Sequence, residues 1–173
     1  MVRFSKGGGE SCTIAVRIAR GTTGRDMVLF SGYHGWHDWY LAAGLLKGSA
    51  FDAFALPNIQ PTGVPKSLEG TCVPFPWGDL APLERLLDTY RGQIAAIIME
   101  PMLLSTPPPA GYLEGVRELA TREEVVLIFD EVTTNFRYGS NGIQEFVGVV
   151  PDAACFAKAI SNGYAMGAVV GRR

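Results

Sequence analysis

Two stretches of the chain are almost wholly apolar: VVLIFD at Val125–Asp130 and IAAIIME at Ile94–Glu100. A strand with one wet face alternates apolar and polar residues, whereas consecutive apolar residues are typical of strands buried on both faces of a parallel sheet. Weaker stretches, at Met27–Ser31, Thr71–Phe75 and Ala168–Val170, are interpreted as further strands. The sequence therefore predicts a mostly parallel sheet.

Helical periodicity occurs between these strands. Apolar residues recur at helical spacing in Glu10–Arg20, Asp79–Tyr90 and Tyr112–Arg122, which predicts a helix over each range. We expect Asp79 to cap the second helix and Ile18 to lie on the apolar side of the first. Strands and helices in this order predict an α/β fold with right-handed connections. No strand is expected before the first helix, and residues 51–70, rich in proline and glycine, are interpreted as an ordered loop.

Composition argues against several classes of protein. Lys and Arg number 15 and Asp and Glu 17, a net charge of -2, which argues against a nucleic-acid binder and a polybasic membrane-surface protein. The longest apolar runs are far shorter than the roughly 20 residues that cross a bilayer, and the first ten residues contain no apolar signal region. Cys12, Cys72 and Cys155 are odd in number and far apart, so we expect free thiols in a reduced, cytoplasmic protein.

The length of 173 residues predicts one domain, or at most one domain and a fragment. Charged residues make up 18% of the chain, below the roughly 25% of an average soluble domain. Neither end has the sequence that we expect of a domain boundary. Two explanations stay open: a chain that covers much of its surface with a partner, or a core that belongs to a larger protein.

Two charged residues stand where an α/β fold can bind a ligand. Asp130 ends a predicted strand, and ligands of such folds bind beyond the carboxyl ends of the strands. An acid there can hold a cationic group or can simply cap a loop. Lys158 lies in the segment PDAACFAKAISNGY, where its amine either reaches solvent or is desolvated and becomes a nucleophile for a carbonyl group.

Two further motifs could contribute to a binding site. The glycine triplet at 7–9 directly precedes a predicted helix, whose free N–H groups can bind phosphate, although a flexible leader has the same composition. Tyr33 and His34 follow the first strand, where an aromatic ring can stack on a flat ligand or fill a hydrophobic gap. His34 and His37 are the only histidines and lack a third ligand in sequence, so no metal site is expected.

These four features have one joint explanation. The glycine turn would bind a phosphate, and an aromatic ring would stack on a flat heterocycle. Asp130 would pair with a protonated ring nitrogen, and Lys158 would bond an aldehyde. Together they describe a site for pyridoxal 5'-phosphate.

On these residues the sequence resembles the class III (ω-type) aminotransferases, and more narrowly their glutamate-1-semialdehyde aminomutase-like branch. The resemblance extends from KGGGESCTIAVRIAR through SGYHGWHD and LIFDEVTTNFRYG to PDAACFAKAISNGYAMGAVVGRR. It implies a three-layer αβα fold, the large domain of PLP fold-type I, and a homodimer for the full-length form. Residues 1–173 would form one incomplete large domain, without the family's N-terminal segment, the strand that leads into the phosphate turn, and the C-terminal small domain.

The resemblance also implies roles for single residues. Lys158 would form a Schiff base with the cofactor and later move a proton, and Asp130 would keep the pyridine nitrogen protonated. The other cofactor-binding residues that it implies are the aromatic pair beside the ring, an apolar residue on the opposite face, the phosphate turn and an acid: Tyr33, His34, Val132, Gly8, Gly9 and Glu100.

The reaction implied is the transfer of an amino group between an amino acid or amine and a carbonyl acceptor. The alternatives are an aminomutase of the glutamate-1-semialdehyde type and a catalytically inactive fragment or remnant of such an enzyme. The sequence departs from the family at three places. The triplet at 7–9 replaces a turn with Ser or Asn, Gly, and then Ser or Thr. Asn135 replaces a Gly, a mild change because Asn tolerates a left-handed backbone, and Ala165 stands where many relatives have Pro.

Overall fold

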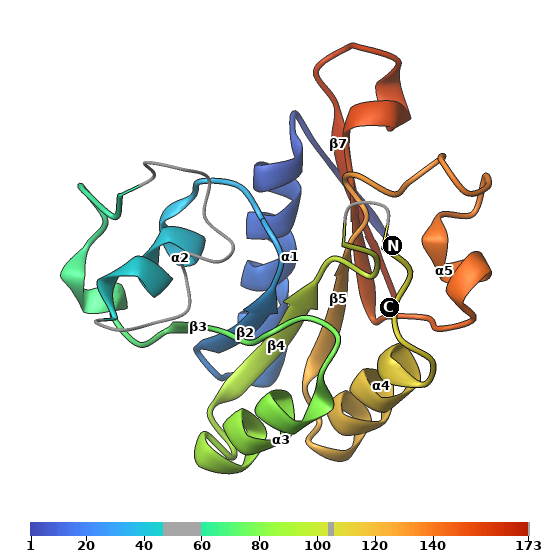
Figure 1. The fold of residues 1–173 in the computed structure, drawn as a ribbon. Helices are drawn as coiled ribbons and strands as arrows, with labels where there is room; N and C mark the ends of the chain where they lie inside the picture. Colours follow the sequence, from blue (N-terminus) through green and yellow to red (C-terminus); the bar gives the residue numbers. More distant parts are fainter. Residues whose placement is uncertain (47–59, 104–105, 173) are drawn as a thin grey trace.

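Seven strands form one sheet in the computed structural model of the chain, which describes residues 1–46, 60–103 and 106–172. Their order across the sheet is β1-β7-β6-β5-β4-β2-β3. Five neighbouring strands run parallel to one another: β3, β2, β4, β5 and β6. Strand β7 is antiparallel to both of its neighbours, β6 and β1 (Figure 1). The strands are Val2–Ser5 (β1), Met27–Ser31 (β2), Cys72–Pro74 (β3), Ile94–Met99 (β4), Val126–Asp130 (β5), Ala153–Phe156 (β6) and Gly167–Gly171 (β7).

Helices cover both faces of the sheet, which confirms the three-layer α/β fold. One apolar cluster joins α1 and α2 to one face, and a second joins α3 and α4 to the other. The α-helices are Gly8–Thr23 (α1), Asp38–Leu41 (α2), Leu80–Thr89 (α3), Tyr112–Arg122 (α4) and Ile143–Val147 (α5). The 3-10 helices within the described residues are Ala42–Leu45 (η1), Lys66–Leu68 (η3) and Lys158–Ser161 (η4).

The central strand β4 shows why its sequence is apolar throughout. All six of its residues are buried. Ala96 and Ile98 belong to the cluster with α1, whereas Ile97 and Met99 belong to the cluster with α3 and α4. Successive side chains of a strand point to opposite faces, so two covered faces require an apolar residue at every position.

Helix α1 packs on the sheet with small side chains. Its buried residues are Ser11, Cys12, Ala15, Val16 and Ala19. Ile18 is 48% exposed, so the expectation that it lies on the buried side is wrong. Short side chains let the helix axis come close to the sheet, and apolarity alone does not reveal which face makes that close approach.

Strand β1 corrects two expectations about the start of the chain. Val2–Ser5 pairs antiparallel with Gly167–Gly171, and the Gly7 turn follows it closely. A strand therefore does precede the first helix, and a strand does lead into the glycine turn. Three of its four residues are exposed, because β1 is an edge strand, so its sequence lacks the buried apolar pattern.

The remaining predicted elements occur with small shifts of their ends. The cap of α3 is confirmed, because Asp79 Oδ1 accepts a hydrogen bond from the Ala81 backbone N–H at 3.0 Å. Strand β6 was not predicted. Residues 51–59 of the expected loop lie outside the described residues, and residues 60–70 contain η3.

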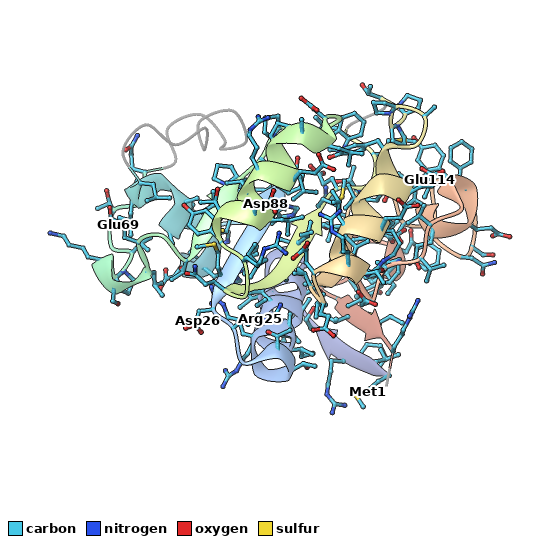
Figure 2. All side chains as sticks on the ribbon, turned by 90° about the horizontal axis from the view of Figure 1, so that it is seen from below. Met1, Arg25, Asp26, Glu69, Asp88 and Glu114 are labelled. Carbon is cyan, nitrogen blue, oxygen red and sulfur yellow. The ribbon has the colours of Figure 1, made fainter. Side chains whose placement is uncertain are left out.

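Arg25 links the start of β4 to the segment before β5. These N-terminal strand ends lie at the edge of the sheet away from the pocket described below. Its Nη1 atom lies 3.2 Å from each of the carbonyl oxygens of Ile94, Glu123 and Glu124. Figure 2 shows Arg25 beside Asp26 on the underside of the molecule, in the turn between α1 and β2. The three cysteines are free, as expected, and the structure shows that all three are buried. Among the described helices, none combines the length and apolarity that a membrane span requires.

Candidate active site

A pocket of about 580 Å³ lies at the carboxyl ends of the parallel strands. Each segment that lines it follows a strand: the glycine turn follows β1, and further segments follow β2, β4, β5 and β6. The structure brings all eight predicted site residues to this pocket: Gly8, Gly9, Tyr33, His34, Glu100, Asp130, Val132 and Lys158.

Asp130 lies at the end of β5 with its carboxylate held by three donors. Its Oδ2 atom lies 2.8 Å from His34 Nδ1 and 3.3 Å from Cys12 Sγ, and its Oδ1 atom accepts the Val132 backbone N–H at 3.0 Å. The residue is 4% exposed. An ionised carboxylate in such a site is stabilised by its hydrogen bonds, because burial alone would disfavour the charge.

His34 is the charged partner of this carboxylate. Burial lowers the pKa of the imidazole, but the hydrogen bonds and charges of Asp130 and Cys12 together outweigh burial and raise the pKa to about 10. The His34 ring is stacked on Trp39, with centroids 6.3 Å apart and planes inclined by 22°. With 1% of its surface exposed, His34 supports Asp130 from within the protein, which leaves Tyr33 as the residue that can stack on a ligand.

Glu100 follows β4 and faces the same pocket. Its Oε2 atom accepts the Tyr33 backbone N–H at 3.1 Å. Burial raises the pKa of Glu100, and the nearby charge of Asp130 raises it further. Gly32 has a φ of +111° and a Cβ there would lie 2.6 Å from Oε2, so only glycine lets Glu100 and Tyr33 approach each other.

Lys158 follows β6 and begins η4. Its backbone is left-handed, with a φ of 49°, and its Nζ atom donates a hydrogen bond to Thr133 Oγ1 at 2.8 Å. The side chain is exposed, so of the two interpretations of its sequence context the structure supports the amine that reaches solvent. Thr133 was not singled out in the sequence, although it lies three residues after Asp130 in the same loop.

The glycine turn brings the start of α1 against Val132. A Cβ at Gly8 would lie 2.8 Å from both methyl groups of Val132, so a side chain at this position requires a shift. Gly7 is the N-cap and offers no side-chain hydrogen bond. The first N–H groups of a helix have no partner within the helix, so the N-terminal end of α1 can donate to an anion in the pocket.

The structure shows what Asn135 does in place of a glycine. Its backbone is not left-handed, and the non-glycine residue of this loop with a positive φ, 56°, is Phe136. Asn135 Nδ2 instead donates to the backbone carbonyls of Glu131, Val132 and Ala157. The amide therefore ties the loop after β5 to the segment that carries Lys158, a function that Gly could not perform.

Cys12, His34 and Asp130 each place a ligand-type atom within 4.8 Å of the others. Their hydrogen bonds to one another account for this proximity. His37 contacts a different residue, with its Nδ1 atom 3.0 Å from Thr13 Oγ1. Cys12 was not predicted as a site residue, because nothing in the sequence brings it next to Asp130, 118 positions away.

Comparison with known proteins identifies the family. All of residues 1–173 match the family described as Aminotransferase class-III. The chain belongs to the class III aminotransferases. This class III aminotransferase chain is 39% identical over 178 residues to the glutamate-1-semialdehyde 2,1-aminomutase of Methanocaldococcus jannaschii. It is 38% identical to the 3-aminobutyryl-CoA aminotransferase of Cloacimonas acidaminovorans.

The same relationship holds in three dimensions. An omega-transaminase from Sphaerobacter thermophilus aligns with 99% of the chain at a TM-score of 0.84 and 32% identity. The alignments cover 100% and 99% of this class III chain and 41% and 39% of the two curated relatives, and 40% of the transaminase structure. The chain thus spans about two fifths of the length of each relative.

The residues of this class III aminotransferase pocket fit pyridoxal 5'-phosphate in their chemistry. A helix N-terminus for a phosphate, a buried carboxylate for a ring nitrogen cation and an amine for an aldehyde all face one cavity. Tyr33 is partly buried edge-to-face against Tyr40, with centroids 5.9 Å apart, so the ring that would flank the cofactor is held in place.

Proposed function

We propose that this chain forms the cofactor site of an enzyme that uses pyridoxal 5'-phosphate to transfer an amino group between an amino acid or amine and a carbonyl acceptor. The observation that carries the proposal is that Asp130, Lys158 and the glycine turn all line the same pocket. Membership of the class III aminotransferases supports it independently of the geometry.

Each residue has a defined task in this proposal. When bound, the cofactor supplies an electron sink for the substrate carbon that carries nitrogen. Asp130 holds a proton on the ring nitrogen, and the charged His34 behind it orients the carboxylate. Lys158 Nζ carries the proton to and from the substrate carbon, and Thr133 holds that amine when no ligand does. Tyr33 and Val132 confine the ring between them.

An aminomutase is the second candidate, because one curated relative at 39% identity is a glutamate-1-semialdehyde aminomutase. The two reactions share every residue named above and differ in whether the amino group stays on one molecule. Incubation with glutamate 1-semialdehyde alone separates them. A mutase forms the isomeric product without any second amino donor, whereas a transaminase requires a separate donor and acceptor.

We propose further that the chain is the central part of a large domain and acts as a cytoplasmic homodimer in its full-length form. Trp36 and Tyr164 line the pocket and are 70% and 84% exposed, which suits a rim that a partner subunit covers. Three free, buried cysteines suit a reducing compartment.

The test is to mix the purified chain with pyridoxal 5'-phosphate, reduce the mixture with borohydride and map the labelled peptides. We expect a pyridoxyl group on Lys158 and a clear excess over the exposed Lys66, which does not line the pocket. The Lys158→Met variant is the control and loses the label. Equal labelling of all lysines would contradict the proposal and would favour an inactive remnant.

A further inference from the structure

His37 lies beside the glycine turn in the wall of the same pocket. A Cβ built on Gly9 would lie 3.7 Å from both Cε1 and Nδ1 of its imidazole. The ring therefore occupies the space next to the place where a side chain at position 9 would begin. The chain has no hydroxyl or amide side chain at positions 7–9 that could donate to a phosphate.

The hydrogen bonds of Thr13 show that Nδ1 of the His37 ring carries a hydrogen atom. Thr13 Oγ1 lies 2.8 Å from the Gly9 carbonyl oxygen, 3.0 Å from Trp39 Nε1 and 3.0 Å from His37 Nδ1. A carbonyl only accepts, so the single hydroxyl hydrogen of Thr13 goes to Gly9. Indole N–H only donates, and the remaining bond then requires that His37 Nδ1 donates its hydrogen to Thr13.

Trp36 is a second residue that fixes the orientation of the His37 ring. The indole of Trp36 is stacked on the imidazole, with centroids 5.6 Å apart and planes inclined by 26°. Because Nδ1 is bonded to Thr13, the nitrogen that remains for a ligand is Nε2, which has no hydrogen-bond partner among residues 1–46, 60–103 and 106–172. In the protonated ring Nε2 is an N–H donor, and the ring itself lies beside Gly9 in the first turn of α1.

We propose that His37 binds the phosphate group of the cofactor through Nε2 and replaces the side-chain donors that the glycine turn lacks. The proposal rests on the proposed function and adds one residue, His37, to those that would bind the cofactor. A dianionic phosphate at the end of α1 would receive backbone N–H groups from the turn and one charge-assisted hydrogen bond from His37. Thr13 and Trp36 are positioning residues, because they act through the His37 ring.

The test compares His37→Asn with the unaltered chain. The Asn amide nitrogen can take the place of Nδ1 and keep the bond to Thr13, while nothing replaces Nε2. We expect the affinity for pyridoxal 5'-phosphate, measured by equilibrium dialysis, to fall about 10-fold or more. The affinity for pyridoxal, which has the same ring and aldehyde without phosphate, is expected to stay the same. His37→Gln, which can place an amide near the Nε2 position, should recover part of the loss.

Failure of this inference differs from failure of the proposed function. If neither pyridoxal nor its phosphate binds the unaltered chain, both proposals fall. If both ligands bind and His37→Asn leaves their ratio unchanged, only the role of His37 falls. Inorganic phosphate gives a second readout: His37 and His34 are the only histidines, so titration by NMR should shift the ring signals of His37 and leave those of buried His34 in place. Unmoved His37 signals would overturn the inference.

Discussion

The Asp130 carboxylate and the His34 imidazole form an ion pair that is almost completely buried. The exposed fractions of the two side chains are 5% and 0%, and their nearest atoms lie 2.8 Å apart. Such a pair is costly to break from one side, because the remaining charge would lie in a medium of low polarity without a partner. The stability of the folded site therefore depends on the protonation of the His34 imidazole.

The stability of the chain should fall at alkaline pH through this pair. The pKa of His34 is about 10 in the folded chain, against 6.5 for an ordinary histidine, so its contribution is complete below pH 6.5 and is lost as the pH rises through 10. We expect a loss of roughly 2–4 kcal/mol in the free energy of unfolding across that range. Urea unfolding of the unaltered chain and of Asp130→Asn at a series of pH values measures it.

The comparison with Asp130→Asn removes the contribution of groups away from Asp130; Cys12, whose raised pKa includes the charge of Asp130, is not one of these. Buried thiols such as Cys72, whose pKa is also raised by burial, ionise on unfolding in both chains and cancel in the difference. In Asp130→Asn the imidazole has no anion beside it, so the alkaline loss should shrink. Identical pH profiles of the two chains would show that the pair does not govern the transition.

At the scale of the element, α1 is placed by its glycines at one end and by its small residues along one side. Gly8 contacts Val132, and Ala15 and Ala19 are buried on the sheet. The same helix contains Gly21, where an added methyl group would meet nothing within 4 Å. A side chain at Gly8 would overlap Val132, whereas a side chain at Gly21 would have free space. Substitution by alanine should therefore have opposite effects on stability at the two positions.

Gly8→Ala should destabilise the chain by about 1–3 kcal/mol, because its methyl group overlaps the methyl groups of Val132. Gly21→Ala is the matched control and should stabilise the chain by roughly 0.5–1 kcal/mol, since alanine has the higher helix propensity and space is free. Thermal unfolding measures both. The double variant Gly8→Ala with Val132→Ala should recover part of the loss, and an absence of recovery would argue against the contact.

At the scale of the whole molecule, the sheet has a buried centre and an exposed edge. Every residue of β4 and nearly every residue of β5 is buried, whereas three of the four residues of β1 are exposed. Strand β1 nevertheless leads into the glycine turn, so the least protected strand holds one wall of the site. A ligand that binds the turn should therefore stabilise the edge of the sheet.

Hydrogen exchange can test this arrangement. We expect the amides of Ile94–Met99 to exchange only through global unfolding, while those of Val2–Ser5 exchange through local opening at least about 100-fold faster. Mass spectrometry of peptides from the native chain measures both rates. Equal protection of β1 and β4 would mean that the sheet opens as one unit.

Part of the site could be predicted because its chemistry is local in sequence. Asp130 ends the predicted strand that became β5, and the carboxyl ends of parallel strands share one edge of a sheet. Lys158 was singled out by its apolar neighbours, because the strand before it, β6, was not predicted. Cys12, Thr133 and His37 could not be found in this way. Their partners are defined by contacts across the pocket, and no spacing along the chain marks such contacts.

The sequence by itself determined the sheet layers, the cap at Asp79 and the types of group that face a ligand. Burial on both faces forces consecutive apolar residues, and a helix start selects its own capping side chain, so both leave local marks. Only the tertiary structure decided the pairing of β1 with β7, the exposed position of Ile18, and the three carbonyls that bind Asn135. Each of these depends on segments far apart in the chain, and their packing energy has no counterpart in the local sequence.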